Sequence, residues 1–276
     1  MYRILKIIGN NFVSAISKNG ETVVLQGLGI GFNKRKGFLV EDSKIERIYH
    51  MDNDKETNKL TQLVEQIPHE HISFVANLID EAQSVLDNKL RANIYISLTD
   101  HISFAIERFN NNKMYKNALL NEIKTFYSQE FNIGLNMLEK INNKFQIDLP
   151  HDEAGFIALH IVNAKLSMNI ADTVELTKII NTVMDIIKDY YPNRFNKDSF
   201  NSSRLITHIK YLAQGIFSNN LISNKDLKLK KFLDDQYPNE SKCVLKIKDE
   251  MKIQFNKKIH DEELLMLAIH INKSKK

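Results

Sequence analysis

The stretch Asp152-Glu153-Ala154-Gly155-Phe156-Ile157-Ala158-Leu159-His160 opens with two acids, continues with mostly apolar residues and ends in a histidine. The same order of residue types returns 110 residues later, in Glu262-Glu263-Leu264-Leu265-Met266-Leu267-Ala268-Ile269-His270. Residues seven apart share one face of a helix. Each histidine therefore lies on the same helical face as an acid two turns back, and the repeat indicates two copies of one helical module.

A second histidine precedes each copy of this stretch. His101 stands in Leu98-Thr99-Asp100-His101 and His208 in Leu205-Ile206-Thr207-His208, 59 and 62 residues before the terminal histidines. Matching residues at a matching separation are typical of a duplicated structural unit. We therefore predict two homologous all-α helical bundles, each of around five helices and each carrying a pair of histidines.

Composition limits the class of protein. Of the 276 residues, 43% are hydrophobic and 26% charged, which is typical of soluble globular domains. No apolar run approaches the roughly 18 residues of a membrane helix, and the first residues lack the pattern of a signal peptide. Cys243 is the single cysteine, so an intrachain disulfide framework is excluded. We expect a cytoplasmic protein of two or three domains, without membrane insertion, cofactor or bound metal.

The amino-terminal end differs from the rest of the chain. Six of the nine glycines lie in the first 37 residues, and residues 1–52 hold eight Lys/Arg against five Asp/Glu while the remainder is nearly neutral. Short runs of branched residues alternate there with turn signals such as Asn19-Gly20. We predict a small antiparallel β-sheet of three or four strands. So thin a core favours pairing with a second copy of the domain.

Residues 26–36 of this domain combine glycines, one aromatic ring and three consecutive cations. Phe32 can stack on an unpaired base, the cations can bind phosphates, and the amides of Asn10 and Asn11 can read base edges. The alternative is that the glycines form turns, Phe32 belongs to the core and the cations lie in a solvated loop. The residues alone allow RNA binding and leave that alternative open.

Residues 51–59 are polar and predict a linker, after which apolar residues recur at helical spacing. Four prolines, at 68, 150, 192 and 238, fall between the helical runs. We therefore predict a sheet domain at 1–56 and helical modules at 57–171 and 172–276.

The histidines allow several roles. A histidine at the edge of an apolar stripe is often structural, and we predict that His160 is half packed with the Glu153 carboxylate within reach. The active roles are metal ligand, general base and phosphoryl acceptor. A helical metal-dependent phosphohydrolase using His151, Asp152 and His160 is one alternative, and a DNA-binding activator with the same modules is another.

The whole chain resembles the BglG/SacY/LicT type of transcriptional antiterminator, an RNA-binding domain followed by two phosphotransferase-system regulation domains. The motifs that carry this resemblance run through the chain in order: Lys6, Asn10-Asn11, Gly27-x-Gly29-x-x-Phe32-Asn33-Lys34, Ser43-Lys44-Ile45-Glu46, Leu98-Thr99-Asp100-His101 and the stretch ending at His160.

The resemblance implies a dimeric four-stranded sheet unit that binds an RNA hairpin in a leader transcript and keeps a terminator from forming. It implies that His101 and His160 answer to the sugar-specific permease, whose phosphorylation inactivates the protein when the sugar is absent. It implies that His208 and His270 receive phosphate from the histidine phosphocarrier protein, and that this phosphorylation activates the protein by tightening the homodimer. The implied RNA surface consists of Lys6, Asn10, Asn11, Gly27, Gly29 and Phe32.

Two positions depart from the family pattern. Gly9 stands where the family often has asparagine, and Leu28 where it often has arginine. We expect these departures to change RNA specificity and to leave the function intact.

Overall fold

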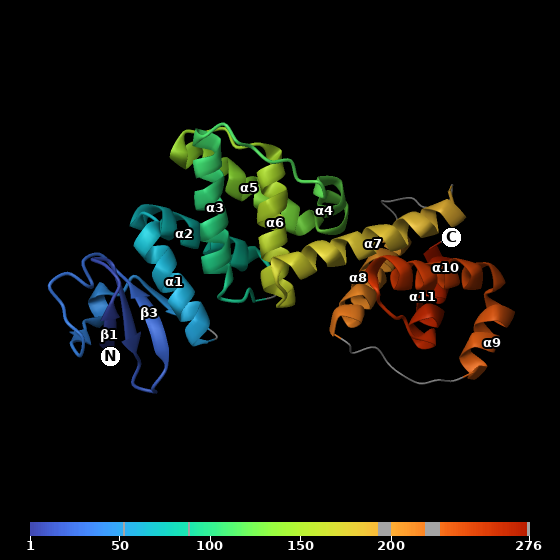
Figure 1. The fold of residues 1–276 in the computed structure, drawn as a ribbon, viewed down its shortest axis with the longest axis horizontal. Helices are drawn as coiled ribbons and strands as arrows, with labels where there is room; N and C mark the ends of the chain where they lie inside the picture. The colour runs from blue at the N-terminus through green and yellow to red at the C-terminus, as the bar shows by residue number, and fades with distance from the viewer. Residues whose placement is uncertain (52, 88, 193–199, 219–226, 275–276) are drawn as a thin grey trace. The chain divides into compact units, whose positions relative to one another are not determined.

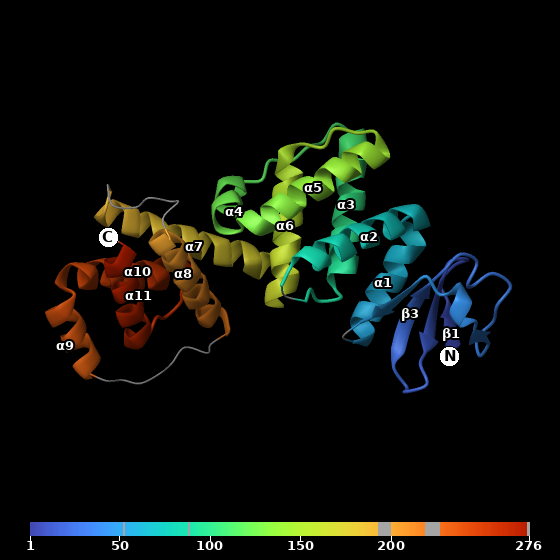
Figure 2. The same cartoon turned by 180° about the vertical axis from the view of Figure 1, so that it is seen from behind.

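The structure is a computed structural model, which describes residues 1–51, 53–87, 89–192, 200–218 and 227–274 (Figure 1). The chain forms two compact units, Met1–Ile170 and Ala171–Lys276. A β-sheet, a short 3-10 helix (Asp42–Lys44) and six α-helices make up the described part of the first unit, and α-helices alone make up that of the second. Figure 2 shows the same chain from behind.

The first unit begins with an antiparallel sheet whose strand order is β4-β1-β2-β3-β5. The three central strands follow one another as a meander, with β2 paired to β1 on one side and to β3 on the other. The bounds are β1 (Tyr2–Ile7), β2 (Phe12–Ile16), β3 (Thr22–Gln26), β4 (Leu39–Val40) and β5 (Arg47–His50).

The predicted number of strands, three or four, is wrong, and so is the four-stranded unit that the resemblance implies. Five strands are present because β4 and β5 close the two edges of the meander. With two and four residues, these strands are too short to show an alternating pattern. Only the pairing of Leu39 with Arg3 and of Ile48 with Leu25 makes them part of the sheet.

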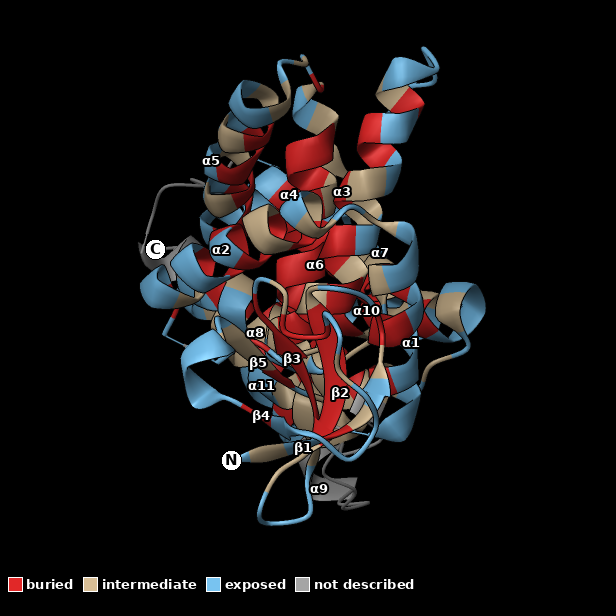
Figure 3. Ribbon diagram, turned by 90° about the vertical axis from the view of Figure 1, so that its left-hand side faces the viewer, coloured by how far each residue is buried: buried red, intermediate tan, exposed pale blue. Residues whose placement is uncertain are grey.

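Both faces of the sheet are buried at its central strands, β2 and β3 (Figure 3). Alternate residues point to opposite faces of a strand, so neighbours along β2 and β3 belong to two different cores. One face is covered by the loops of the domain and contains Ile4, Val13, Ala15, Val23, Leu25, Ile30 and Val40. The other face packs on the first helices of the unit and contains Ile8, Phe12, Val24, Tyr49, Leu60, Leu63, Ile72 and Ile96.

The predicted linker at residues 51–59 is helical from Asp54 onward. Asn53 begins this helix, because its side-chain oxygen accepts a hydrogen bond from the Glu56 backbone N–H at 3.0 Å. Polar composition concealed a helix whose apolar side, with Leu60 and Leu63, contacts the sheet. The helices of the first unit are α1 (Asp54–Gln66), α2 (His69–Val85), α3 (Ile94–Asn110), α4 (Leu120–Phe126), α5 (Ser128–Phe145) and α6 (His151–Leu166).

Helix α6 is the central element of this bundle, and most of it is buried in Figure 3. A Cβ atom added to Gly134 of α5 would lie 2.5 Å from the carbonyl oxygen of Ala154 in α6. The glycine therefore allows the two helices to pack at close range. α3 packs on another side of α6, which brings the two histidine-bearing helices together.

The second unit repeats this plan. Its helices α10 and α11 pack together as α5 and α6 do. The residues that follow α5 and α10, Gln146 and Asn256, lie 110 positions apart and have φ of 53° and 52°. The left-handed conformation at both ends shows that the repeat extends to the backbone. The bounds are α7 (Ile170–Tyr190), α8 (Phe200–Ser218), α9 (Leu227–Gln236), α10 (Pro238–Phe255) and α11 (Asp261–Ser274).

In the described ranges, no single helix combines the length and hydropathy that a membrane span needs; α6 and α7 meet that test only as a bent pair.

Candidate functional site

The first pair of histidines comes together where α3 packs on α6. The ring centroids of His101 and His160 lie 5.0 Å apart. His101 Nε2 lies 2.9 Å from Oε2 of Glu153, and Arg108 donates from Nη2 to the other oxygen of that carboxylate at 2.7 Å. Glu153 is only 1% exposed. A buried carboxylate needs such partners, so His101 is part of a three-residue polar cluster in the core.

His160 is more deeply buried than the predicted half-packed position. It is 9% exposed, and its Nδ1 lies 3.3 Å from the hydroxyl of Ser97. Burial, followed by the neighbouring His101, lowers the pKa of His160 to about 3. The prediction that Glu153 lies within reach of His160 is wrong. Seven residues along a helix span about 10 Å, and the crossing of α3 places His101 against the carboxylate instead.

The second pair of histidines is also brought together, by α8 and α11. The rings of His208 and His270 stack with centroids 3.4 Å apart and an interplanar angle of 20°. Both residues are half-buried. Burial, followed by His208, Lys273 and Arg204, lowers the pKa of His270 to about 4. Burial, followed by Arg204, also lowers the pKa of His208. Both imidazoles are therefore neutral at pH 7.

The candidate RNA surface is built from a turn and a loop that are tied together. The Asn11 side-chain oxygen accepts a hydrogen bond from the Gly29 backbone N–H at 2.8 Å, and the carbonyl of Asn10 accepts one from the Gly31 N–H at 2.9 Å. Sequence reasoning missed Gly31, where a Cβ atom would lie 2.2 Å from the carbonyl oxygen of Gly9. Gly31 therefore lets the loop approach the turn.

Exposure separates the predicted RNA-binding residues into two groups. Phe32 is 59% exposed, which excludes a core position for its ring, and Lys6 and Asn10 are exposed as well. Gly27 is buried, since a Cβ atom there would lie 1.8 Å from the Lys44 carbonyl oxygen, and Gly29 has φ of +65°. The two glycines shape the loop, whereas the exposed side chains can meet a ligand.

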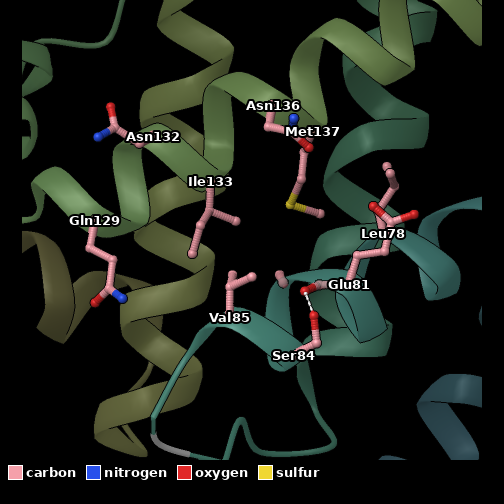
Figure 4. Close-up of a pocket in the computed structure, with 10 residues that line it drawn as sticks. Leu78, Glu81, Ser84, Val85, Gln129, Asn132, Ile133, Asn136 and Met137 are labelled. Carbon is pink, nitrogen blue, oxygen red and sulfur yellow. Dashed lines mark hydrogen bonds between the residues drawn. The ribbon is translucent and has the colours of Figure 1, made fainter.

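A cavity lies elsewhere in the first unit (Figure 4). It has a volume of about 560 Å³ between α2 and α5, and residues such as Val85, Ile133 and Met137 line it. None of the predicted site residues belongs to its lining. It therefore takes no part in either histidine pair.

The residues of the phosphohydrolase alternative do not form a metal site. Asp152 accepts a hydrogen bond from the backbone N–H of Asn117 at 2.6 Å, whereas His151 is exposed and His160 is buried beside Ser97. Across the described part of the chain, no three His, Cys, Asp or Glu side chains are grouped as metal ligands.

Three parts of the chain match known protein families. Residues 2–58 match the CAT RNA binding domain, and residues 76–164 and 181–274 each match the PRD domain. The transcription antiterminator LicT of Bacillus subtilis (strain 168) is 36% identical over 271 residues, which cover 98% of each chain. The chain belongs to the BglG/LicT family of antiterminators. Members of this family are RNA-binding regulators and not enzymes.

Two further relatives support the assignment of this antiterminator. The beta-glucoside operon antiterminator of Dickeya chrysanthemi is 34% identical, with 98% of this chain and 96% of that protein covered. The crystal structure of GlcT CAT-PRDI is 32% identical with a TM-score of 0.53, and it covers 59% of this chain and 98% of that one. The predicted family, the RNA-binding function and the class of fold are thereby confirmed.

Proposed function

We propose that this antiterminator is switched by phosphorylation of its paired histidines. The donors are the histidine phosphocarrier protein and a sugar-specific permease of the phosphotransferase system. The sheet domain, residues 1–56, binds a hairpin in a leader transcript as a homodimer in the cytoplasm, and the modules at 57–171 and 172–276 control that dimer. The acceptors are His101, His160, His208 and His270.

The observation that carries this proposal is the pairing itself. Histidines 59 and 62 residues apart in the sequence come together in the two modules, with 5.0 Å and 3.4 Å between ring centroids. A structural histidine needs only one hydrogen-bond partner. Two rings in contact, repeated in a second module, support a shared role in accepting a phosphoryl group.

The protonation of the rings supports the same role. A phosphoryl acceptor attacks through the lone pair of an unprotonated ring nitrogen. The lowered pKa values of His160, His208 and His270 keep these imidazoles neutral at pH 7. A proton therefore does not have to leave before transfer.

Phosphorylation at the first pair has to disrupt the core of its module. A phosphoryl group adds about two negative charges, and at His101 it would stand beside the buried carboxylate of Glu153. His160 becomes accessible to a donor only when α3 and α6 separate. Repulsion and access therefore both favour an opened module, which is the behaviour expected of an inactivating modification.

Helix α3 connects this pair to the RNA-binding domain. Tyr95, in its first turn, donates a hydrogen bond to Asp80 at 2.6 Å and packs edge-on against Tyr49 of β5. Arg47 of β5 binds the same Asp80 at 2.5 Å. Two residues beyond Tyr95, Ser97 contacts His160. A shift of α3 would therefore change the contacts of β5.

The donors' roles can be tested in a reporter strain carrying a leader terminator. We expect His101→Ala to raise antitermination without sugar, and His208→Ala or His270→Ala to lower it. The opposite sign in either module would contradict the assigned roles, and equal expression of the variants is the control.

The RNA surface, which lies in residues 1–56, is tested by gel retardation with the full-length protein. Phe32→Ala should weaken hairpin binding by about 1–3 kcal/mol if the ring stacks on a base. Phe38→Ala, which removes an exposed ring outside the predicted surface, is the matched control. Equal affinity of Phe32→Ala and the unmodified protein would place the RNA elsewhere.

A further inference from the structure

The two histidine pairs differ in the residues that flank them at one end. Four residues before the first histidine of each pair stands Ser97 in the first module and Arg204 in the second. Three residues after the second histidine stands Asn163 in the first module and Lys273 in the second. Two neutral side chains therefore correspond to two cations.

The first module shows where these flanking positions lie. Ser97 of α3 reaches across to the ring of His160 at 3.3 Å, and Asn163 follows His160 by one turn of α6. Asn163 is 5% exposed and, with Asn93 and Ile94 of the α3 start, lines a cavity of about 120 Å³. Both positions thus belong to the end of the pair where α3 begins and α6 approaches its last turn.

The same positions in the second module carry charge. α8 and α11 pack together and hold the stacked rings of His208 and His270. Arg204 precedes the first ring by one turn and Lys273 follows the second by one turn. Both side chains are exposed, and both act electrostatically on His270. The pair is therefore flanked at that end by two cations at the protein surface.

We propose that Arg204 and Lys273 bind the phosphoryl group carried by His208 or His270 and make the second pair the better acceptor of the two. This inference rests on the proposed function. The guanidinium of Arg204 matches phosphate oxygens with two parallel hydrogen bonds, and the ammonium of Lys273 adds a point charge. At the two corresponding positions, the first pair offers the hydroxyl of Ser97 and the amide of Asn163 in place of cations.

The transfer balances without another reactant. The lone pair of one ring nitrogen in the neutral acceptor imidazole forms the new N–P bond, while the N–P bond of the donor phosphohistidine breaks. The donor ring, protonated at its other nitrogen, leaves as neutral imidazole, and the acceptor ring becomes the protonated phosphohistidine. The two cations compensate the charge of the phosphoryl oxygens before and after transfer.

The test uses the full-length protein and phosphorylated histidine phosphocarrier protein with a labelled phosphoryl group. Arg204→Ser and Lys273→Asn install the residues of the first module. We expect each to slow labelling of the second pair about tenfold, the effect of one charged hydrogen bond, and to shorten the lifetime of the phosphohistidine after the donor is removed. Arg204→Lys should retain most of the rate, since it keeps the charge.

The control is Lys252→Ser, which removes an exposed cation of α10 and should change neither rate nor lifetime. Thermal unfolding shows whether each variant is folded. Labelling of Arg204→Ser and Lys273→Asn at the unmodified rate and lifetime overturns the inference alone. If His208→Ala and His270→Ala do not reduce the labelling of the protein, the proposed function fails, and the inference fails with it.

Discussion

The two histidine pairs occupy corresponding places in a duplicated module, yet different charged side chains surround them. The first pair is tied to the buried carboxylate of Glu153, which Arg108 also binds. The second pair is stacked, half-buried and flanked by Arg204 and Lys273. Repetition of the fold has preserved the approach of the two rings. It has not preserved what surrounds them, and the surroundings decide how each pair responds to added negative charge.

The same contrast extends to the whole modules. Residues 57–171 contain ten Lys/Arg and thirteen Asp/Glu, whereas residues 172–276 contain nineteen Lys/Arg and fourteen Asp/Glu. The near neutrality of the helical part thus conceals an acidic and a basic module. Charge of this kind affects which partners associate and how fast. It is consistent with two different phosphoryl donors.

The largest expected effect on stability is that of replacing Arg108, which is present in the first module alone. Arg108→Ala leaves Glu153 buried without its cation, and breaking such a pair costs about 3–5 kcal/mol. Gly215 stands at the corresponding place in the second module, so the second pair is assembled without this arginine. Urea unfolding should show the loss in the first unit only. A change below about 1 kcal/mol would mean that the carboxylate is not dependent on Arg108.

The next effect is a pH dependence carried by His160. Its folded-state pKa of about 3 lies below the ordinary value of 6.5, so the unfolded chain binds more protons between these values. Stability is full above about pH 6.5 and falls as the pH drops toward 3, by about 1.4 kcal/mol per pH unit. His160→Asn should flatten this dependence. His270, whose pKa is lowered in the same direction but whose ring is only half-buried, should give a weaker response in the variant His270→Asn.

A greater loss of the pH dependence in His270→Asn than in His160→Asn would contradict the assignment of the first pair as the more deeply buried one. Denaturant unfolding between pH 4 and pH 7 provides the measurement, with separate probes for the two units.

The smallest effect is expected at the junction between α3 and the sheet. Tyr95→Phe removes one hydrogen bond to Asp80, worth about 1 kcal/mol, and burial together with Asp80 raises the pKa of Tyr95 to about 12, so the hydroxyl is a donor throughout the neutral range. In the reporter assay the variant should reduce the response to His101→Ala while the response to His208→Ala stays unchanged. An equal loss of both responses would show that the junction does not serve the first pair alone.

Local patterns in the sequence were sufficient for much of the fold. Glycines and the Asn19-Gly20 turn indicated a small antiparallel sheet, and the repeat ending at His160 and His270 indicated twin bundles with paired histidines. The exposed ring of Phe32 agrees with the predicted surface. Periods of two and 3.6 residues reflect backbone geometry, so they can be read along the chain without tertiary information.

Contacts between distant segments could not be read in this way. The edge strands β4 and β5 are defined by their neighbours, and the polar start of α1 resembled a linker. The prediction that Glu153 is the partner of His160 failed because the partner of a side chain depends on which neighbouring helix packs beside it, here α3.

The sequence by itself determined that this protein has a basic sheet domain and two modules with a histidine pair each. The tertiary structure decided that His160 is buried, that Glu153 binds His101 and Arg108, and that Tyr95 contacts the sheet. The physical reason is that spacing along one helix fixes which residues share a face, whereas burial and pairing arise only when a second helix packs against that face.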